Sequence, residues 1–152
     1  MKNSLFLSVL FLLNNSTFSY SQENKNDITS YTDKVNVFLG TSGDHGQMSP
    51  AASSPFNMMS IGPQTYPHIH AGYEYLAKEF IGFTHTRIEG VGCLGSGGNL
   101  LVKPIVNSKQ NTKLLKKTEK ASPGLYAVSF ENGIEAKIQV EHNFGIHEYL
   151  FP

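Results

Sequence analysis

The sequence has 152 residues, the size of a single domain, and 39% of them are hydrophobic, which is enough for a core. Twelve Lys and Arg residues balance twelve Asp and Glu residues, so the formal net charge is zero. Such a chain has no overall field that would attract nucleic acid or an anionic membrane, and we expect neither as a partner.

Residues 1–21 have the pattern of a secretory signal peptide. A short positive start, MKN, precedes the apolar run LFLSVLFLL at residues 5–13, and the small residues Ser19 and Ser21 suit signal peptidase. The run is shorter than the roughly 20 residues that cross a bilayer as a helix. We expect a cleaved signal and a secreted or periplasmic mature chain. The alternative is a buried N-terminal helix.

Residues 22–34 are polar and are interpreted as a linker that leads into the folded domain, residues 35–152. Short extended segments then alternate with turns, because 11 of the 14 glycines lie between Gly40 and Gly98. The single cysteine, Cys93, allows no internal disulfide. In this part of the chain, the pattern predicts strands at residues 35–40, 56–62, 71–76, 79–83 and 99–104.

The last third of the chain predicts antiparallel strands. Segments 125–130 and 134–141 flank an Asn-Gly pair, which readily takes positive φ at both central positions of a hairpin turn. Apolar and polar residues alternate along 134–141, which indicates a strand with one buried face, and 144–152 predicts a further strand. The predicted fold class is all-β, an antiparallel β-sandwich that we expect to be incomplete within this chain.

The lysine-rich segment 108–124 allows two interpretations. It is either a basic patch for an acidic polymer, or an exposed loop or edge strand, where lysine discourages edge-to-edge association. The absence of interleaved aromatic residues favours the second interpretation.

The glycine-rich segment 82–104 allows several kinds of site. Residues 90–95 match G-x-G-x-x-G, but no helix can begin among the glycines that follow, which argues against a dinucleotide site. Cys93 with His85 could form a thiol nucleophile and its base, although no third member is recognisable. Zinc could be held by a set drawn from His45, His68, His70, His85 and Cys93. The glycines could equally let the backbone approach a sugar or another domain. The residues alone leave these alternatives open.

Four blocks in one order, residues 35–59, 71–93, 97–104 and 120–152, resemble the N-terminal domain of glycoside hydrolase family 92, the calcium-dependent exo-acting α-mannosidases. The G-T-x-G, P-F-x-M, H-T, G-x-G-C and A-S-P-G-x-Y motifs are all present. Asn57 and Thr84 stand where the family pattern has glycine and serine.

The resemblance implies a β-sandwich that packs on an (α/α)6 barrel. In the family, the barrel supplies the general acid, the general base and most of the calcium site, and the sandwich lends loops to the pocket wall. Cleavage with inversion requires two carboxylates roughly 6.5–9.5 Å apart. We therefore expect calcium on the barrel, no metal bound by this chain, and two partners, α-mannoside glycans and the barrel.

The resemblance places Gly92 and Cys93 at the substrate, with His85, Asp44 and His45 as further candidates. No pair of acidic residues forms a catalytic constellation, and three carboxylates that could be proposed as an acid are expected to face solvent on strands: Glu89, Glu141 and Glu148. The chain is thus expected to be a pocket-lining, barrel-packing part of a secreted α-mannosidase, inactive alone. The alternatives are a non-catalytic module that binds carbohydrate or a partner, and an unrelated enzyme that uses His85 and Cys93.

Overall fold

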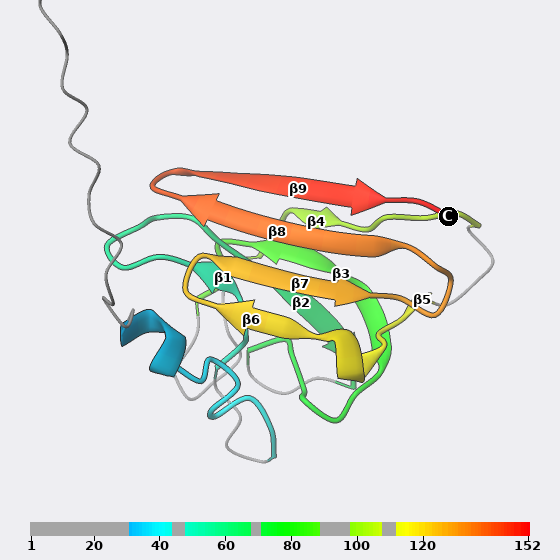
Figure 1. Ribbon diagram of the computed structural model, residues 1–152, viewed down its shortest axis with the longest axis horizontal. Helices are drawn as coiled ribbons and strands as arrows, with labels where there is room; N and C mark the ends of the chain where they lie inside the picture. The colour runs from blue at the N-terminus through cyan, green and yellow to red at the C-terminus, as the bar shows by residue number, and fades with distance from the viewer. Residues whose placement is uncertain (1–30, 44–47, 68–70, 89–97, 108–111) are drawn as a thin grey trace, which may run out of the picture.

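The computed structural model describes residues 31–43, 48–67, 71–88, 98–107 and 112–152. Two antiparallel sheets face each other as the layers of a β-sandwich (Figure 1). The predicted fold class, all-β with antiparallel strands, is confirmed. No helix in the described part of the chain is long and apolar enough to cross a membrane.

The first sheet is built around β3. Its order is β1-β2-β3-β4, and β5 also pairs with β3, all antiparallel. The register of β2 on β3 shifts once, between Gln64 and Thr65. The strands are β1 (Ala52–Ser53), β2 (Ser60–Tyr66), β3 (Glu79–His85), β4 (Leu101–Val102) and β5 (Thr112–Lys113).

The second sheet is a four-stranded meander in the order β6-β7-β8-β9. Buried and exposed residues alternate along β8 without a break, as its sequence pattern predicts. Among the described residues, β9 pairs with β8 alone and forms an edge of this sheet. The strands are β6 (Lys120–Ser122), β7 (Leu125–Ser129), β8 (Glu135–Glu141) and β9 (Phe144–Leu150).

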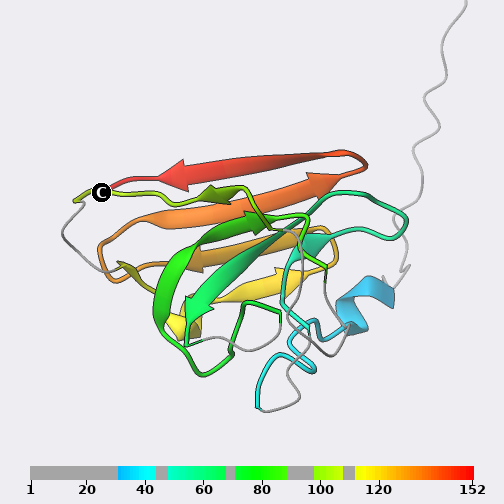
Figure 2. The ribbon, with the colours of Figure 1, turned by 180° about the vertical axis from the view of Figure 1, so that it is seen from behind.

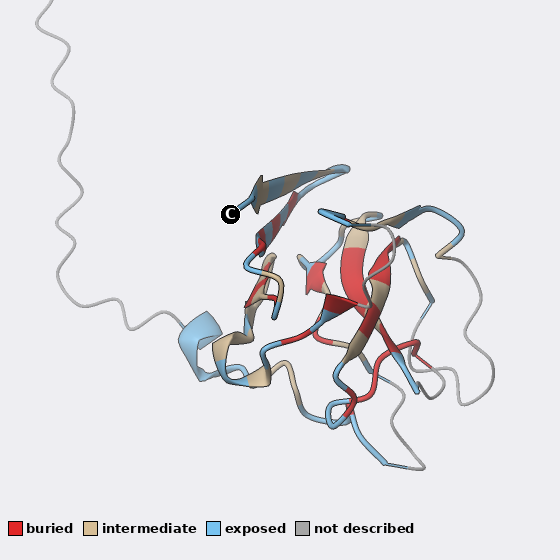
Figure 3. Cartoon of the chain, turned by 90° about the vertical axis from the view of Figure 1, so that its right-hand side faces the viewer, coloured by how far each residue is buried: buried red, intermediate tan, exposed pale blue. Residues whose placement is uncertain are grey.

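The core lies between the two sheets, where the buried residues of both layers meet (Figure 3). Phe80 and Phe83 of β3 lie 4.8 Å apart between ring centroids, and Phe80 is also 4.8 Å from Phe130. Phe83 contacts Tyr126 of β7 edge-on. Tilted and edge-to-face packing of aromatic rings is favourable because of their quadrupoles, so these rings join the layers.

The predicted hairpin at residues 131–133 is present between β7 and β8, but its turn differs from the expectation. Gly133 has φ of +85°, whereas Asn132 is not among the described residues with positive φ. The Gly133 amide donates to the Phe130 carbonyl at 3.0 Å, and the Phe130 amide donates to the Ile134 carbonyl at 2.8 Å. This is a three-residue loop that ends with glycine in the left-handed region.

Two predicted strands are wrong. Residues 35–40 form turns, because the Asn36 side chain accepts the Phe38 amide at 3.0 Å and so competes with strand pairing. Residues 71–76 form a loop in which the Glu74 amide donates to the Thr65 hydroxyl and the Tyr75 amide donates to the Thr41 carbonyl. The predicted strand at 56–62 begins only at Ser60.

The lysine-rich segment 108–124 ends as an edge strand, β6, with Lys120 exposed, in agreement with the second interpretation. Before it, the 3-10 helix η2 (Lys116–Thr118) places Lys116 over the rings of Tyr73 and Tyr75. That lysine is therefore not a solvated charge. At the other end of the described chain, η1 (Tyr31–Lys34) is a 3-10 helix without buried residues. The predicted signal peptide and residues 22–30 of the predicted linker lie outside the described residues.

Candidate functional site

The structure describes one of the five predicted substrate-binding residues, His85. Gly92, Cys93, Asp44 and His45 lie outside the described residues and remain predictions. His68 and His70, which were considered as metal ligands, also lie outside. Described residues lie on both sides of segments 44–47 and 89–97.

His85 is the last residue of β3, and both of its ring nitrogens are engaged within the protein. Its Nδ1 lies 3.1 Å from the Leu100 carbonyl oxygen, and its Nε2 lies 2.9 Å from Nε2 of His147 on β9. The two imidazole rings stack with centroids 4.9 Å apart. In this arrangement, His85 offers no free ring nitrogen to a ligand.

Described residues on both sides of segment 89–97, which contains Gly92 and Cys93, make defined backbone contacts. Before it, Thr86 has φ of +52°, and its amide donates to the Ser60 carbonyl at 2.7 Å. After it, the Leu100 carbonyl accepts a hydrogen bond from the His85 amide at 3.2 Å. A non-glycine residue with positive φ is uncommon and costs free energy, so the surrounding contacts must stabilise this sharp bend after β3.

Glu74 holds the turn that leads to Asp44 and His45. Its carboxylate accepts the Ser42 hydroxyl at 2.5 Å, the Gly43 amide at 3.2 Å and the Leu76 amide at 3.0 Å. Burial opposes ionisation of this carboxyl group, but the hydrogen bonds outweigh it and the pKa of Glu74 lies below its usual range. The charged form of Glu74 is therefore built into this turn.

A polar cluster that the sequence did not reveal lies at Glu119. Its Oε1 accepts hydrogen bonds from the hydroxyl groups of Tyr73, at 2.8 Å, and Tyr126, at 2.6 Å. Lys116 Nζ lies 2.5 Å from Oε2 and donates to the Tyr73 hydroxyl at 2.6 Å. Burial and the Glu119 charge raise the pKa of both tyrosines far above the usual value. The only sequence signal was a glutamate between lysines, which usually marks a solvated surface.

Two of the three carboxylates that were considered as a catalytic acid lie on exposed strand positions. Glu141 and Glu148 are exposed on strands, as predicted, and Glu148 lies 3.7 Å from Lys137. Glu89 lies outside the described residues. Among the described residues, no group of three or more His, Cys, Asp or Glu side chains comes together in the way that a metal ion would need.

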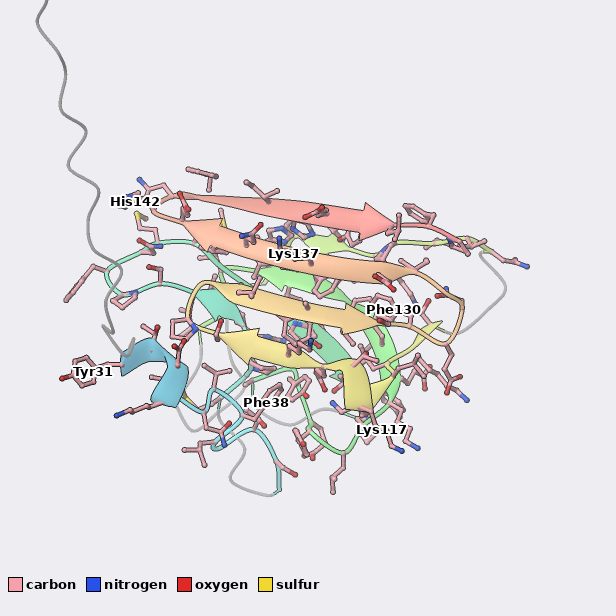
Figure 4. All side chains as sticks on the ribbon, viewed as in Figure 1. Tyr31, Phe38, Lys117, Phe130, Lys137 and His142 are labelled. Carbon is pink, nitrogen blue, oxygen red and sulfur yellow. The ribbon has the colours of Figure 1, made fainter. Side chains whose placement is uncertain are left out.

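Exposed apolar side chains gather on the loop between β1 and β2. Phe56 and Met58, both of the P-F-x-M motif, are largely exposed to solvent, and Phe56 has φ of +62°. Figures 1 and 2 show this loop at the same end of the sandwich as the β8–β9 turn, which carries His142 (labelled in Figure 4). Phe144, the first residue of β9 after that turn, is also exposed.

The outer face of the four-stranded sheet carries a hollow of about 720 Å³. Lys117, Lys137, Glu135 and Glu148 contribute charged groups to its lining, and Ala127 and Ser129 are among its smaller residues. Figure 4 labels Lys117 and Lys137 on this face. The lining includes one aromatic residue, Tyr149.

Comparison with known proteins agrees with the resemblance in sequence. The family model that describes the glycosyl hydrolase family 92 N-terminal domain matches residues 34–152 of this sequence. A protein of Arthroderma benhamiae described as an uncharacterized secreted glycosidase is 24% identical over 139 residues, which cover 83% of this chain and 18% of that protein.

Two solved structures are similar in both sequence and fold. The gh92 family glycosyl hydrolase ccman5 is 33% identical with a TM-score of 0.72, over 80% of this chain and 19% of its own. The family GH92 alpha-mannosidase BT3965 from Bacteroides thetaiotaomicron is 27% identical with a TM-score of 0.68, over 80% of this chain and 18% of its own. The chain thus spans less than a fifth of the length of these relatives. By the match over residues 34–152, it belongs to glycosyl hydrolase family 92 and contains the N-terminal domain of that family.

Proposed function

We propose that this chain is the N-terminal, pocket-lining and barrel-packing part of a secreted α-mannosidase. Three findings support the proposal: the family match, a solved relative named as an alpha-mannosidase, and a relative named as a secreted glycosidase. The substrate class would be α-mannoside glycans.

The exposed P-F-x-M loop carries the barrel-packing part of the proposal. The Phe56 side chain is exposed to water, and its backbone adopts a left-handed conformation, which is unfavourable for a bulky residue. Local strain of this kind persists where the surrounding structure imposes it, often at functional positions. Exposed Phe and Met side chains on one loop are typical of a surface that another domain covers.

The chain alone would not hydrolyse mannosides. Inverting hydrolysis needs one carboxylic acid at the leaving oxygen and one carboxylate at the attacking water. Among the described residues, Glu141 and Glu148 face solvent on strands, and Glu74 and Glu119 are committed to hydrogen bonds that hold the fold. The general acid, the general base and calcium would lie on the barrel.

The experiment uses the purified chain and the barrel portion of a family relative such as ccman5, produced separately. We expect no release of nitrophenol from an aryl α-mannoside by the chain alone with calcium present. We expect calorimetric binding to the barrel portion, which Phe56→Ser with Met58→Ser weakens. Leu76→Ser, at another exposed apolar position, is the control. Turnover by the chain alone, or equal binding by the double variant, would contradict the proposal.

The hollow on the second sheet supports an alternative, a carbohydrate-binding module. The charged and hydroxyl groups in its lining could donate hydrogen bonds to sugar hydroxyl groups or accept them. Calorimetry with mannobiose separates the two functions. Binding that Ser129→Tyr abolishes and Phe56→Ser leaves unchanged would favour the alternative, because Ser129 lines the hollow and Phe56 does not.

A further inference from the structure

Three side chains connect the two sheets through a continuous chain of hydrogen bonds. His85 of β3 contacts the Leu100 carbonyl through Nδ1, at 3.1 Å, and His147 through Nε2, at 2.9 Å. His147 Nδ1 in turn lies 2.7 Å from the hydroxyl oxygen of Tyr149, two residues further along β9. The chain thus runs from the residue before β4 to the edge strand of the opposite sheet.

The chemistry of the end group fixes the direction of every hydrogen bond in this chain. A carbonyl oxygen only accepts, so Nδ1 of His85 carries a proton and donates to Leu100. The Nε2 of a neutral His85 then accepts, and His147 must donate from its own Nε2. The remaining Nδ1 of His147 is left to accept, and the Tyr149 hydroxyl donates to it. The acceptor role of the Leu100 carbonyl therefore determines both neutral tautomers: His85 carries its proton on Nδ1, and His147 carries its proton on Nε2.

The environment favours the neutral form of His147 that this assignment requires. Burial, and secondarily the neighbouring His85, lower the pKa of His147 below its usual value. Burial raises the pKa of Tyr149 to about 12, so its hydroxyl keeps the proton that it donates. Among the described groups, His85 is the one titratable neighbour that contributes to this lowering.

We propose that His147 and Tyr149 are positioning residues for His85. Through His85, they fix the two ends of segment 86–100, which connects β3 to β4. His85 ends β3, immediately before Thr86, and its partner Leu100 immediately precedes β4. The first and last residues of segment 86–100 therefore both lie next to the imidazole of His85, and β9 holds that ring in place through His147. The role of this segment as a pocket wall rests on the proposed function, whereas the hydrogen-bond chain does not.

A pair of substitutions at residue 147 separates hydrogen bonding from simple packing. His147→Gln keeps an N–H donor near the position of Nε2 but loses the ring. His147→Phe keeps a ring, which can still pack edge-on against Phe83 as His147 does at 5.9 Å, but loses the donor. A positioning role predicts that Gln preserves the state of His85, and a packing role predicts that Phe preserves it.

The measurement is nitrogen NMR of the histidine rings in the whole chain at about pH 8, above the usual histidine pKa of about 6.5. In the native protein, we expect His85 protonated on Nδ1, His147 protonated on Nε2, and a scalar coupling between the two Nε2 atoms. We expect the His147→Gln variant to keep the hydrogen-bonded shift of His85 Nε2. We expect the His147→Phe variant to move it toward that of a free ring nitrogen and to shift the amide signals of residues 86–88 and 98–100.

The opposite tautomer of His85, or equal spectra for the native protein and the His147→Phe variant, would overturn the proposal. If His147→Phe does not fold, Tyr149→Phe takes its place: losing the donor to the neutral ring should raise the pKa of His147, and an unchanged pKa would overturn the proposal. Titration with mannobiose on the same samples reports on the proposed function. The expected tautomers together with no sugar binding would contradict the proposed function alone. The opposite tautomer of His85 would contradict the hydrogen-bond chain, whether or not sugar binds.

Discussion

Tyr73 and Tyr126 donate hydrogen bonds to the same carboxylate oxygen, Oε1 of Glu119. Tyr73 lies in the loop before β3, whereas Tyr126 lies on β7 of the other sheet. Both tyrosines are fully buried. The carboxylate of Glu119 therefore joins the two layers of the sandwich at one point, with Lys116 balancing its charge.

Replacing Glu119 should be among the most destabilising single changes in the described part of the chain. Glu119→Ala leaves two buried hydroxyl groups and a half-buried ammonium group without their acceptor, and breaking a buried pair in this way costs about 3–5 kcal/mol. Chemical denaturation measures the loss. Tyr126→Phe is the matched control, because it removes one hydrogen bond and should cost about 1 kcal/mol. If Glu119→Ala lowered the free energy of unfolding by less than about 0.5 kcal/mol, as is usual at a surface position, Glu119 would not be the contact that joins the two layers.

Glu74→Ala should destabilise the turn before Asp44 and the fold as a whole. The change removes three hydrogen bonds to a charged acceptor and leaves the Gly43 and Leu76 amides without it. Bonds to charged groups contribute about 1.5–3 kcal/mol each before relaxation, and we expect a net loss of about 2 kcal/mol in the free energy of unfolding.

Ser42→Ala is the control for Glu74→Ala, since it removes one donor and leaves both amide contacts. The effect of Glu74 should also depend on pH. Because the folded-state pKa is lowered, its contribution is complete above the usual value of 4.5 and is lost as the pH falls through the folded pKa. Equal losses for the Glu74→Ala variant at neutral and strongly acidic pH would show that the charge is not responsible.

Stability should fall on mild acidification because of His147. Its pKa is lowered in the folded state, so below the usual value of 6.5 the unfolded chain binds the proton more readily than the folded one. The contribution of neutral His147 to the free energy of unfolding is therefore complete above about pH 6.5, and it decreases as the pH falls toward the folded-state pKa of His147. Denaturation between about pH 5 and pH 8, within the range where histidine titrates, should show a slope that His147→Gln reduces. His142→Gln, at the exposed β8–β9 turn, should retain it.

The edge strand β9 should cause self-association. Its outer face exposes Phe144, Ile146 and Leu150, and the described residues leave one backbone edge of β9 without a partner strand. Such an edge pairs readily with another chain, and an inserted lysine prevents this. Sedimentation should show dimers or larger species for the native chain and more monomer for Ile146→Lys. Leu76→Lys, away from β9, is the control, and an equal effect of both would contradict a specific role of β9.

Local sequence determined the second sheet almost completely. Alternation along 134–141 predicts which side chains of β8 are buried, and a short glycine-containing loop between two such segments requires antiparallel pairing. The family motifs carried the assignment of the family, which the match over residues 34–152 confirms. These features depend on spacing within a few residues, and spacing is what a sequence displays.

Tertiary structure alone decided the contacts that hold the candidate site. Segment 71–76 looked like a strand, yet its backbone pairs with Thr41 and Thr65, which are distant in sequence, and its Tyr73 and Glu74 side chains are buried in polar contacts. His85 stays a predicted substrate-binding residue, and its contacts with the Leu100 carbonyl and with His147 could not be seen in the sequence. A hydrogen bond depends on distance and direction in space, and residues 62 positions apart acquire these only when the two sheets pack. The sequence by itself therefore determined most of the second sheet and the family, and the packing of the sheets decided which polar side chains support the structure.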